Sequence, residues 1–225
     1  MKTPLLAVCA IQIILLIGSQ PVLAQNQMAP APTESEKEAF YARSVEYRVA
    51  DILKALSLAD AAKSNAVHDV LVTQYHDLRV RDAAIDTRLK VDGKEVSYAN
   101  RAEQLAALSK PLHDAFLTKL AASLTSEQVE QIKDLMTYNK VKVTYDAYGV
   151  IMPGLTEAEK AKILELLKAA REEAMDGGSA PEKSEIFQKY KNQINAYLDA
   201  QGHDTAKAFA DWTAKNPNTN NPVAK

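Results

Sequence analysis

The sequence predicts an all-α protein, a helical bundle of about six to seven helices with one irregular tyrosine-rich connecting segment. Three observations support this class. Apolar residues recur at intervals of three and four along most of the chain, which is the period of a helix face. Residues that can cap a helix precede these stretches, and glycines follow several of them. The alternation of apolar and polar residues that is typical of a strand is confined to one short segment.

Residues 1–24 are predicted to be a secretory signal peptide. Lys2 precedes the apolar run Leu5–Ile17, and Val22-Leu23-Ala24 forms a small-residue cleavage site. The run is shorter than the ~20 residues that span a bilayer, so cleavage is favoured over retention as an anchor, and no membrane span is expected afterwards. We therefore expect an exported protein, periplasmic or extracellular. Its mature chain is cysteine-free, because Cys9 lies inside the signal.

The remaining chain divides into three parts. Residues 25–33 form a proline-spaced linker, residues 34–215 a single helical domain, and residues 216–225 a disordered tail. The full chain has 27 basic and 29 acidic residues with no basic stripe, so nucleic acid is not expected as a partner.

The helices can be placed in order from their apolar faces. The first begins at Glu34 and carries Val45, Val49, Ile52, Leu53 and Leu56 on one face. The second is expected to begin at Ser57 and to end at the Asp92-Gly93 turn signal. Ser97 opens the third, in which Pro111 should produce a kink or a break near Ser109, because proline removes one backbone donor.

Two further helices begin with a capping box. Thr125 and Thr156 are each followed three residues later by Gln128 and Glu159, a pattern that satisfies two free backbone donors. Gly177-Gly178 ends the second of these helices. Another helix then runs from about Pro181 to a cap at Gly202, and a short last helix carries Phe209 and Trp212.

Met136–Gly154 is predicted to be the irregular segment, with an extended piece where Val141, Val143 and Tyr145 alternate with polar residues. Tyrosine rings interleaved with short polar side chains suit the recognition of a sugar. The candidate ligand-binding residues are Tyr138, Asn139, Lys142, Tyr145, Asp146 and Tyr148, with Arg171 and Asp176 as lesser candidates. The alternative interpretation is that the tyrosines fill gaps between helices and bond locally.

Catalytic and metal chemistry have little support. His68 and His76 are too far apart on one helix to share an ion, and His113 and His203 lack neighbouring ligands. There is no G-x-S-x-G motif, and the acidic pairs are typical of a solvated helix face. We therefore expect no metal site and no cofactor, and the sequence favours a binding protein over an enzyme.

Three stretches resemble a known family. They are LTSEQVEQIKDLMTYNKVKVTYDAY, LTEAEKAKILELLKAAREEAMDGGSAPEK and KYKNQINAYLDAQGHD, with ALSLADAAKSNAVHDVLVTQYHDL upstream. They resemble the DUF3826 family of exported bacterial proteins of unknown function, over roughly 41–212. The resemblance implies a sugar-binding role and brings no catalytic residues.

A second, local resemblance leaves another function open. Leu124-Thr125-Ser126-Glu127-Gln128 is similar to the L-T-x-x-Q motif of Spy-like periplasmic chaperones, which hold unfolded proteins. The hypotheses are therefore a carbohydrate-binding protein, a holdase-type chaperone with protein clients, or a structural envelope protein.

Overall fold

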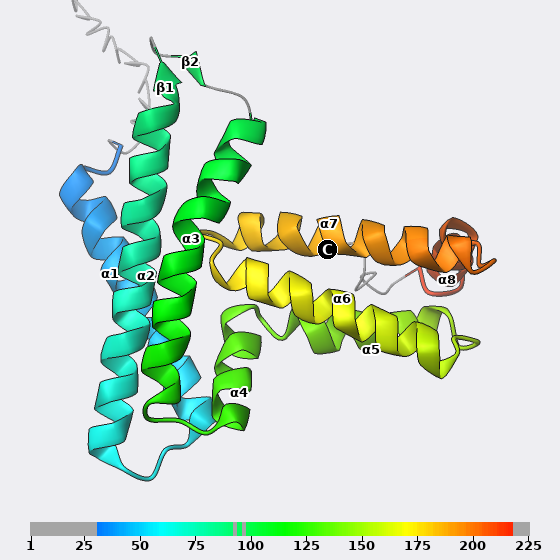
Figure 1. Ribbon diagram of the computed structural model, residues 1–225, viewed down its shortest axis with the longest axis horizontal. Helices are drawn as coiled ribbons and strands as arrows, with labels where there is room; N and C mark the ends of the chain where they lie inside the picture. Colours follow the sequence, from blue (N-terminus) through cyan, green and yellow to red (C-terminus); the bar gives the residue numbers. More distant parts are fainter. Residues whose placement is uncertain (1–30, 92–93, 96–97, 218–225) are drawn as a thin grey trace, which may run out of the picture.

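The computed structural model describes residues 31–91, 94–95 and 98–217 (Figure 1). Eight α-helices lie in this part of the chain, and the all-α class is confirmed. They are α1 (Glu34–Leu56), α2 (Ala61–Leu89), α3 (Tyr98–Ala121), α4 (Ser126–Met136), α5 (Lys140–Ile151), α6 (Glu157–Met175), α7 (Ala180–Ala200) and α8 (Thr205–Lys215). Two short strands, β1 (Lys90–Val91) and β2 (Lys94–Glu95), pair antiparallel between α2 and α3. The predicted signal peptide, most of the linker, the Asp92-Gly93 turn and most of the tail lie outside the described residues.

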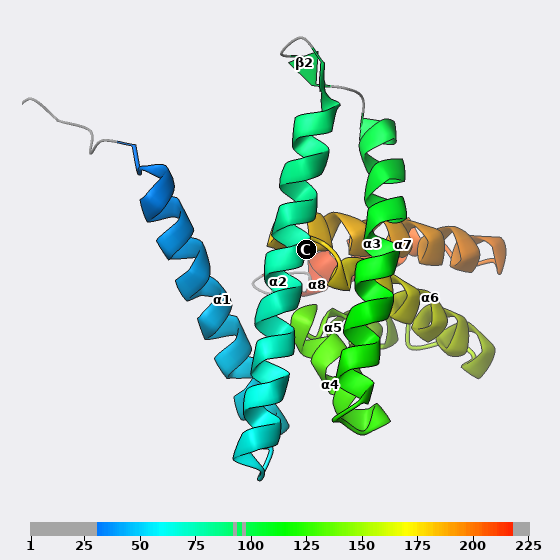
Figure 2. The same cartoon turned by 60° about the vertical axis from the view of Figure 1, so that its left-hand side comes forward.

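The helices form two groups set crosswise. Helices α1, α2 and α3 stand side by side, and α5 to α8 form an arm that projects from them (Figure 1). The short α4 packs against α1, α3 and α6, so it links the two groups. Figure 2 shows that the C-terminal end of α1 lies close to α2. The N-terminal end of α1 diverges from α2.

Each group has its own hydrophobic cluster. The first lies among α1 to α4 and includes Val49, Leu71 and Ile132. The second lies among α5 to α8 and includes Leu167, Phe187 and Ile194. Met175, the last residue of α6, belongs to the first cluster although the rest of α6 belongs to the second. The C-terminal end of α6 therefore lies where the two groups meet.

The helix starts confirm the capping chemistry predicted at Thr125 and Thr156. Each threonine hydroxyl accepts a hydrogen bond from the backbone of Gln128 or Glu159, whose side chain bonds back to the threonine backbone. Ser57 was expected to begin the second helix, but it ends α1 in a left-handed conformation with φ 50°. Asp60 caps the start of α2 instead, because the Asp60 carboxylate accepts hydrogen bonds from the backbone N–H groups of Ala62 and Lys63.

Helix α3 does not break at Pro111. The helix runs continuously from Tyr98 to Ala121. Pro111 has no N–H to donate to the Ala107 carbonyl one turn earlier. Both residues are exposed, so water can hydrogen-bond this carbonyl instead. The apolar face continues beyond the proline with Phe116 and Leu120, which are buried in the first cluster.

The prediction that Met136–Gly154 forms an irregular segment is wrong. Lys140–Ile151 is helix α5, and the expected extended piece at Val141–Tyr145 lies inside it. Its buried positions are Val141, Thr144, Ala147, Tyr148 and Ile151, which share one helix face. Packing of this face against α6 outweighs the strand preference of its β-branched residues. Within the predicted segment, the non-helical residues are the joint between α4 and α5, where Tyr138 and Asn139 have positive φ, and residues 152–154 after α5.

Candidate functional site

The structure separates the candidate residues proposed from the sequence. Tyr138 and Asn139 are exposed at the joint between α4 and α5. Tyr148 is fully buried, and its hydroxyl donates to Asn195 Oδ1 at 2.6 Å. Its ring packs edge-to-face on Phe209, and burial raises its pKa. Tyr148 is therefore a core residue of the arm.

A cavity of about 410 Å³ beside α5 brings three of these residues together. We call it the tyrosine pocket; it is lined by Tyr145, Asp146, Tyr148, Gly149, Val150, Leu155, Lys160 and Ile163. Its two charged groups are already paired. Asp146 lies 2.5 Å from Lys142, and Lys160 lies 2.8 Å from Glu157. The tyrosine pocket is thus mostly apolar and offers few free hydrogen-bonding groups.

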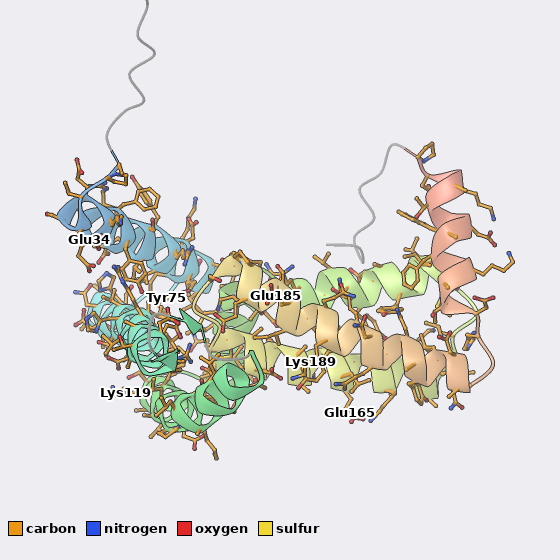
Figure 3. The ribbon with its side chains drawn as sticks, turned by 90° about the horizontal axis from the view of Figure 1, so that it is seen from above. Glu34, Tyr75, Lys119, Glu165, Glu185 and Lys189 are labelled. Atoms are coloured by element: carbon orange, nitrogen blue, oxygen red, sulfur yellow. The ribbon has the colours of Figure 1, made fainter. Side chains whose placement is uncertain are left out.

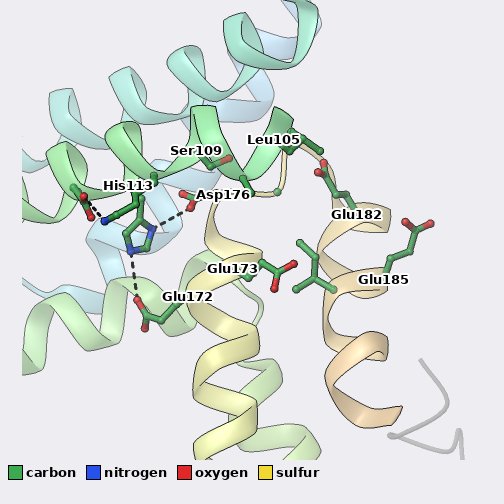
Figure 4. A pocket seen from close by; sticks show the side chains of 13 residues that line it. Leu105, Ser109, His113, Glu172, Glu173, Asp176, Glu182 and Glu185 are labelled. Atoms are coloured by element: carbon green, nitrogen blue, oxygen red, sulfur yellow. Dashed lines mark hydrogen bonds and ion pairs between the residues drawn. The ribbon is translucent and has the colours of Figure 1, made fainter. Parts of the chain in front are cut away.

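A second cavity, of about 360 Å³, lies where the two groups of helices meet (Figure 4). We call it the junction pocket. Its walls come from α3, the C-terminal end of α6 and the first turns of α7. Six carboxylates line it: Asp114, Glu172, Glu173, Asp176, Glu182 and Glu185. Ser109, Lys110 and His113 add polar groups, and Leu105, Ala106 and Ile186 form an apolar wall.

The turn between α6 and α7 fixes one side of this pocket. A Cβ atom at Gly178 would lie 1.8 Å from Asp82 Oδ2 of α2, so only glycine fits there without a shift. Arg81, also on α2, is buried and donates to the Asp176 carbonyl and to Ser109 Oγ, each at 2.7 Å. Arg81 thereby ties α2 to both α3 and the end of α6.

Lys183 secures the same turn from α7. Its ammonium donates to the carbonyls of Ala174 and Met175 at 3.0 and 3.2 Å, at the C-terminal end of α6. Burial lowers the pKa of Lys183 to about 8, because the charged form loses hydration. The end of α6 is therefore held by buried cations from two helices.

His113 connects α3 to α6. Its Nδ1 lies 3.1 Å from Asp176 Oδ2, and its Nε2 lies 3.7 Å from Glu172 Oε2 (Figure 4). The hydrogen bond with Asp176 raises the pKa of His113, although burial opposes it. Both carboxylates face the imidazole, so the protonated ring is favoured at this position.

Arg171 is another residue proposed from the sequence, and it lies on the side of α6 that faces α4. Its guanidinium donates to Asp134 at 2.7 Å, to Glu172 at 3.1 Å and to Glu130. Burial opposes the charge of Arg171, but the hydrogen bonds with Asp134 and Glu130 raise its pKa. Arg171 therefore joins the two groups of helices, and it lines neither the tyrosine pocket nor the junction pocket.

The junction pocket carries more negative than positive charge. Asp114 pairs with Lys110 at 2.7 Å and Glu173 with Lys189 at 2.7 Å. Glu172 lies 3.0 Å from Lys133. Among the described residues, no ion pair is formed by Glu182 or Glu185.

Of the candidate residues named from the sequence, Asp176 alone lines the junction pocket, and its other lining residues were not predicted. Ser109 and His113 share one face of α3 through their spacing of four residues, a signal that was available. Nothing local showed that Glu182 and Glu185 of α7 would face them. In the described part of the chain, no three His, Asp or Glu side chains converge as metal ligands, and no helix is long and apolar enough to cross a bilayer.

Comparison with known families places most of the chain in a family model. A family model described as "Protein of unknown function (DUF3826)" matches residues 42–217. No curated protein matches the chain.

Proposed function

The chain belongs to the DUF3826 family of proteins of unknown function, and on this premise we propose that it is an exported carbohydrate-binding protein. The proposed site is the junction pocket. The observation that carries the proposal is a cavity of about 360 Å³ with acceptors on several sides and an apolar wall. Small-ligand sites occupy roughly 300–1,000 Å³ and combine apolar lining with a few placed polar groups.

The lining suits a ring that carries hydroxyl groups. Carboxylates accept hydrogen bonds from hydroxyls, and bonds to a charged acceptor are stronger than neutral ones. Ser109 Oγ already accepts from Arg81, so its own hydrogen is available to a ligand oxygen. Leu105 and Ile186 can contact the C–H groups of the ring.

The tyrosine pocket supports the same function less well. Tyr145 offers an aromatic face, but the charged groups nearby are committed to Lys142 and Glu157. A sugar bound there would lose water from its hydroxyls without gaining equivalent partners. The two pockets can therefore be compared directly in one experiment.

Thermal unfolding against a panel of mono- and oligosaccharides tests the proposal. A ligand at 100 times its Kd adds about 2.7 kcal/mol of stability, which corresponds to a rise of roughly 5–10 °C in Tm. Ala106→Phe fills the junction pocket and should abolish the rise. Val150→Phe, at a 64% exposed residue of the tyrosine pocket, is the matched control and should leave it intact.

Two outcomes would contradict the proposal. If no sugar of the panel raises the Tm of the wild-type protein, the proposal of carbohydrate binding is contradicted. A rise that survives Ala106→Phe and disappears with Val150→Phe would move the site to the tyrosine pocket.

A second candidate function, the holding of unfolded proteins, is favoured by one observation. Phe40 and Tyr47 lie seven residues apart on α1 and are 68% and 75% exposed, so one face of this helix presents two aromatic rings to solvent. Suppression of client aggregation that is lost in Phe40→Ser and Tyr47→Ser would support this function. Equal suppression by the variants would exclude this face.

A further inference from the structure

Two carboxylates of the junction pocket set the charge that its ligand should carry. Glu182 and Glu185 are three residues apart on α7, and both line the cavity; in Figure 4 the Glu182 side chain points toward α3 and that of Glu185 points outward. Glu182 is held in place because its Oε2 accepts from the Gly178 N–H at 2.8 Å. Four other lining carboxylates have cationic partners, whereas these two form no ion pair in the described part of the chain.

We infer that the junction pocket takes an amino sugar, whose ammonium group binds on the α7 side of the cavity, where Glu182 and Glu185 lie, while its hydroxyls face Ser109 and Asp176. This inference rests on the proposed function and adds the charge of the ligand. An ammonium offers three donors and a positive charge, which matches carboxylates that lack a cationic partner in the described part of the chain.

The geometry favours an organic cation over a metal ion. No three acidic or histidine side chains of the described residues converge on one point, as a metal site requires. The carboxylates are instead distributed around a cavity of about 360 Å³. Leu105, Ala106 and Ile186 line the same cavity, and an apolar wall stabilises carbon atoms but not a hydrated ion.

Asp176 gives independent support for a ligand with several donors. Its side chain is only 12% exposed, and Oδ2 is occupied by His113. Its Oδ1 is buried and has no hydrogen-bond partner among the described residues. A buried acceptor without a partner is costly, so a ligand donor that reaches Oδ1 after a rotation of the Asp176 side chain would remove that cost.

Paired sugars that differ only in the amine test the inference. Isothermal titration at pH 6, where a primary amine is protonated, compares glucosamine with glucose, galactosamine with galactose, and mannosamine with mannose. N-acetylglucosamine serves as the uncharged amide. We expect the amine of at least one pair to bind about tenfold more tightly than its parent sugar, as two partly exposed ion pairs would give.

Variants locate the source of the preference. Glu182→Gln and Glu185→Gln should each reduce the ratio of amine to parent-sugar affinity to about threefold or less, because the amide keeps an acceptor but loses the charge that attracts an ammonium. Glu165→Gln is the matched control, because Glu165 lies on α6 farther along the arm than Glu185 (Figure 3). It should leave the preference as in the wild-type protein.

The outcomes separate the two claims. Equal affinity for amine and parent sugar would overturn the inference and leave the proposed function standing. A preference that persists in both glutamine variants would also overturn it, since the charge would then come from elsewhere. Absence of binding for every sugar tested would overturn the proposed function and the inference together.

Discussion

The two hydrophobic clusters and the junction between them are built from different chemistry. Leu71, Leu167 and Phe187 are fully buried among other apolar side chains. The junction is held by charged groups, with Arg81, Arg171 and Lys183 buried against carboxylates or backbone carbonyls. Apolar packing tolerates many sequences, whereas buried charges require particular partners.

This difference explains where a cavity can persist. Apolar side chains interdigitate and leave few voids inside a cluster. At the junction, buried ion pairs and a glycine turn fix three helices at positions that leave polar groups such as Ser109 and Glu185 facing the cavity. Stability should therefore depend most on the clusters, and ligand binding most on the junction.

The largest expected loss of stability comes from opening a cluster. Phe187→Ala should lower the free energy of unfolding by about 3–5 kcal/mol, because a fully buried ring is replaced by a void. Val143→Ala is the control, since Val143 is 47% exposed and should change stability by less than about 0.5 kcal/mol. Urea unfolding measures both, and similar losses would contradict the assignment of the second cluster.

Removing a buried cation of the junction should lower the free energy of unfolding by less than Phe187→Ala does. Arg171→Met removes a cationic partner from Asp134 and from Glu130, which keeps Lys133, and these carboxylates are 38% and 46% exposed and can be hydrated. We expect a loss of about 2 kcal/mol, below the cost of breaking a fully buried pair. Lys162→Met removes an exposed pair with Glu165 and should cost at most about 0.5 kcal/mol. An Arg171→Met protein as stable as Lys162→Met would contradict this account.

A side chain at Gly178 should lower the free energy of unfolding by a smaller amount, and a second substitution at Asp82 should restore part of it. Gly178→Ala forces a methyl group against Asp82, which Arg81 holds at 2.7 Å, so we expect a loss of about 1–2 kcal/mol. In an Asp82→Ala background the loss should shrink. Gly154→Ala, where the methyl meets no atom within 4 Å, should leave stability within about 0.5 kcal/mol. Equal effects of Gly178→Ala in both backgrounds would contradict the contact.

The smallest expected effect is a pH dependence at His113. The hydrogen bond with Asp176 raises the pKa of His113 in the folded protein, so protonated His113 stabilises the fold fully below the ordinary histidine pKa of about 6.5. This contribution declines as the pH rises through the folded-state pKa. Destabilisation by His113→Gln, measured by urea unfolding, should be larger at pH 5.5 than at pH 8.5. In an Asp176→Asn background, the difference between the two pH values in the effect of His113→Gln should be smaller. An unchanged difference would show that a group other than Asp176 causes this pH dependence.

Much of the fold follows from local sequence patterns. The capping boxes at Thr125 and Thr156 are formed within four residues, and the structure contains both. The end of α6 before Gly177 and the positive φ of Gly202 also follow from single residues. By contrast, α5 was hidden because its β-branched residues alternate over a few positions, while the face that decides its structure recurs over twelve residues.

The candidate site depends on contacts that no local pattern reveals. The lining of the junction pocket extends from Leu105 to Ile186 along the chain, and only the crossing of α3 with the α6–α7 turn brings these residues together. Tyr148 illustrates the opposite error. Its polar tip suggested ligand contact, but the hydroxyl donates to Asn195 within the arm.

One titration tests the central claim, that the ligand site is at the charged junction and not beside α5. Isoleucine methyl groups can be labelled for NMR, and Ile186 lines the junction pocket whereas Ile163 lines the tyrosine pocket. Titration with the tightest-binding sugar of the panel should shift the Ile186 methyl resonance in proportion to occupancy and leave that of Ile163 in place. A shift of Ile163 with Ile186 unchanged would contradict the account and place the ligand in the tyrosine pocket.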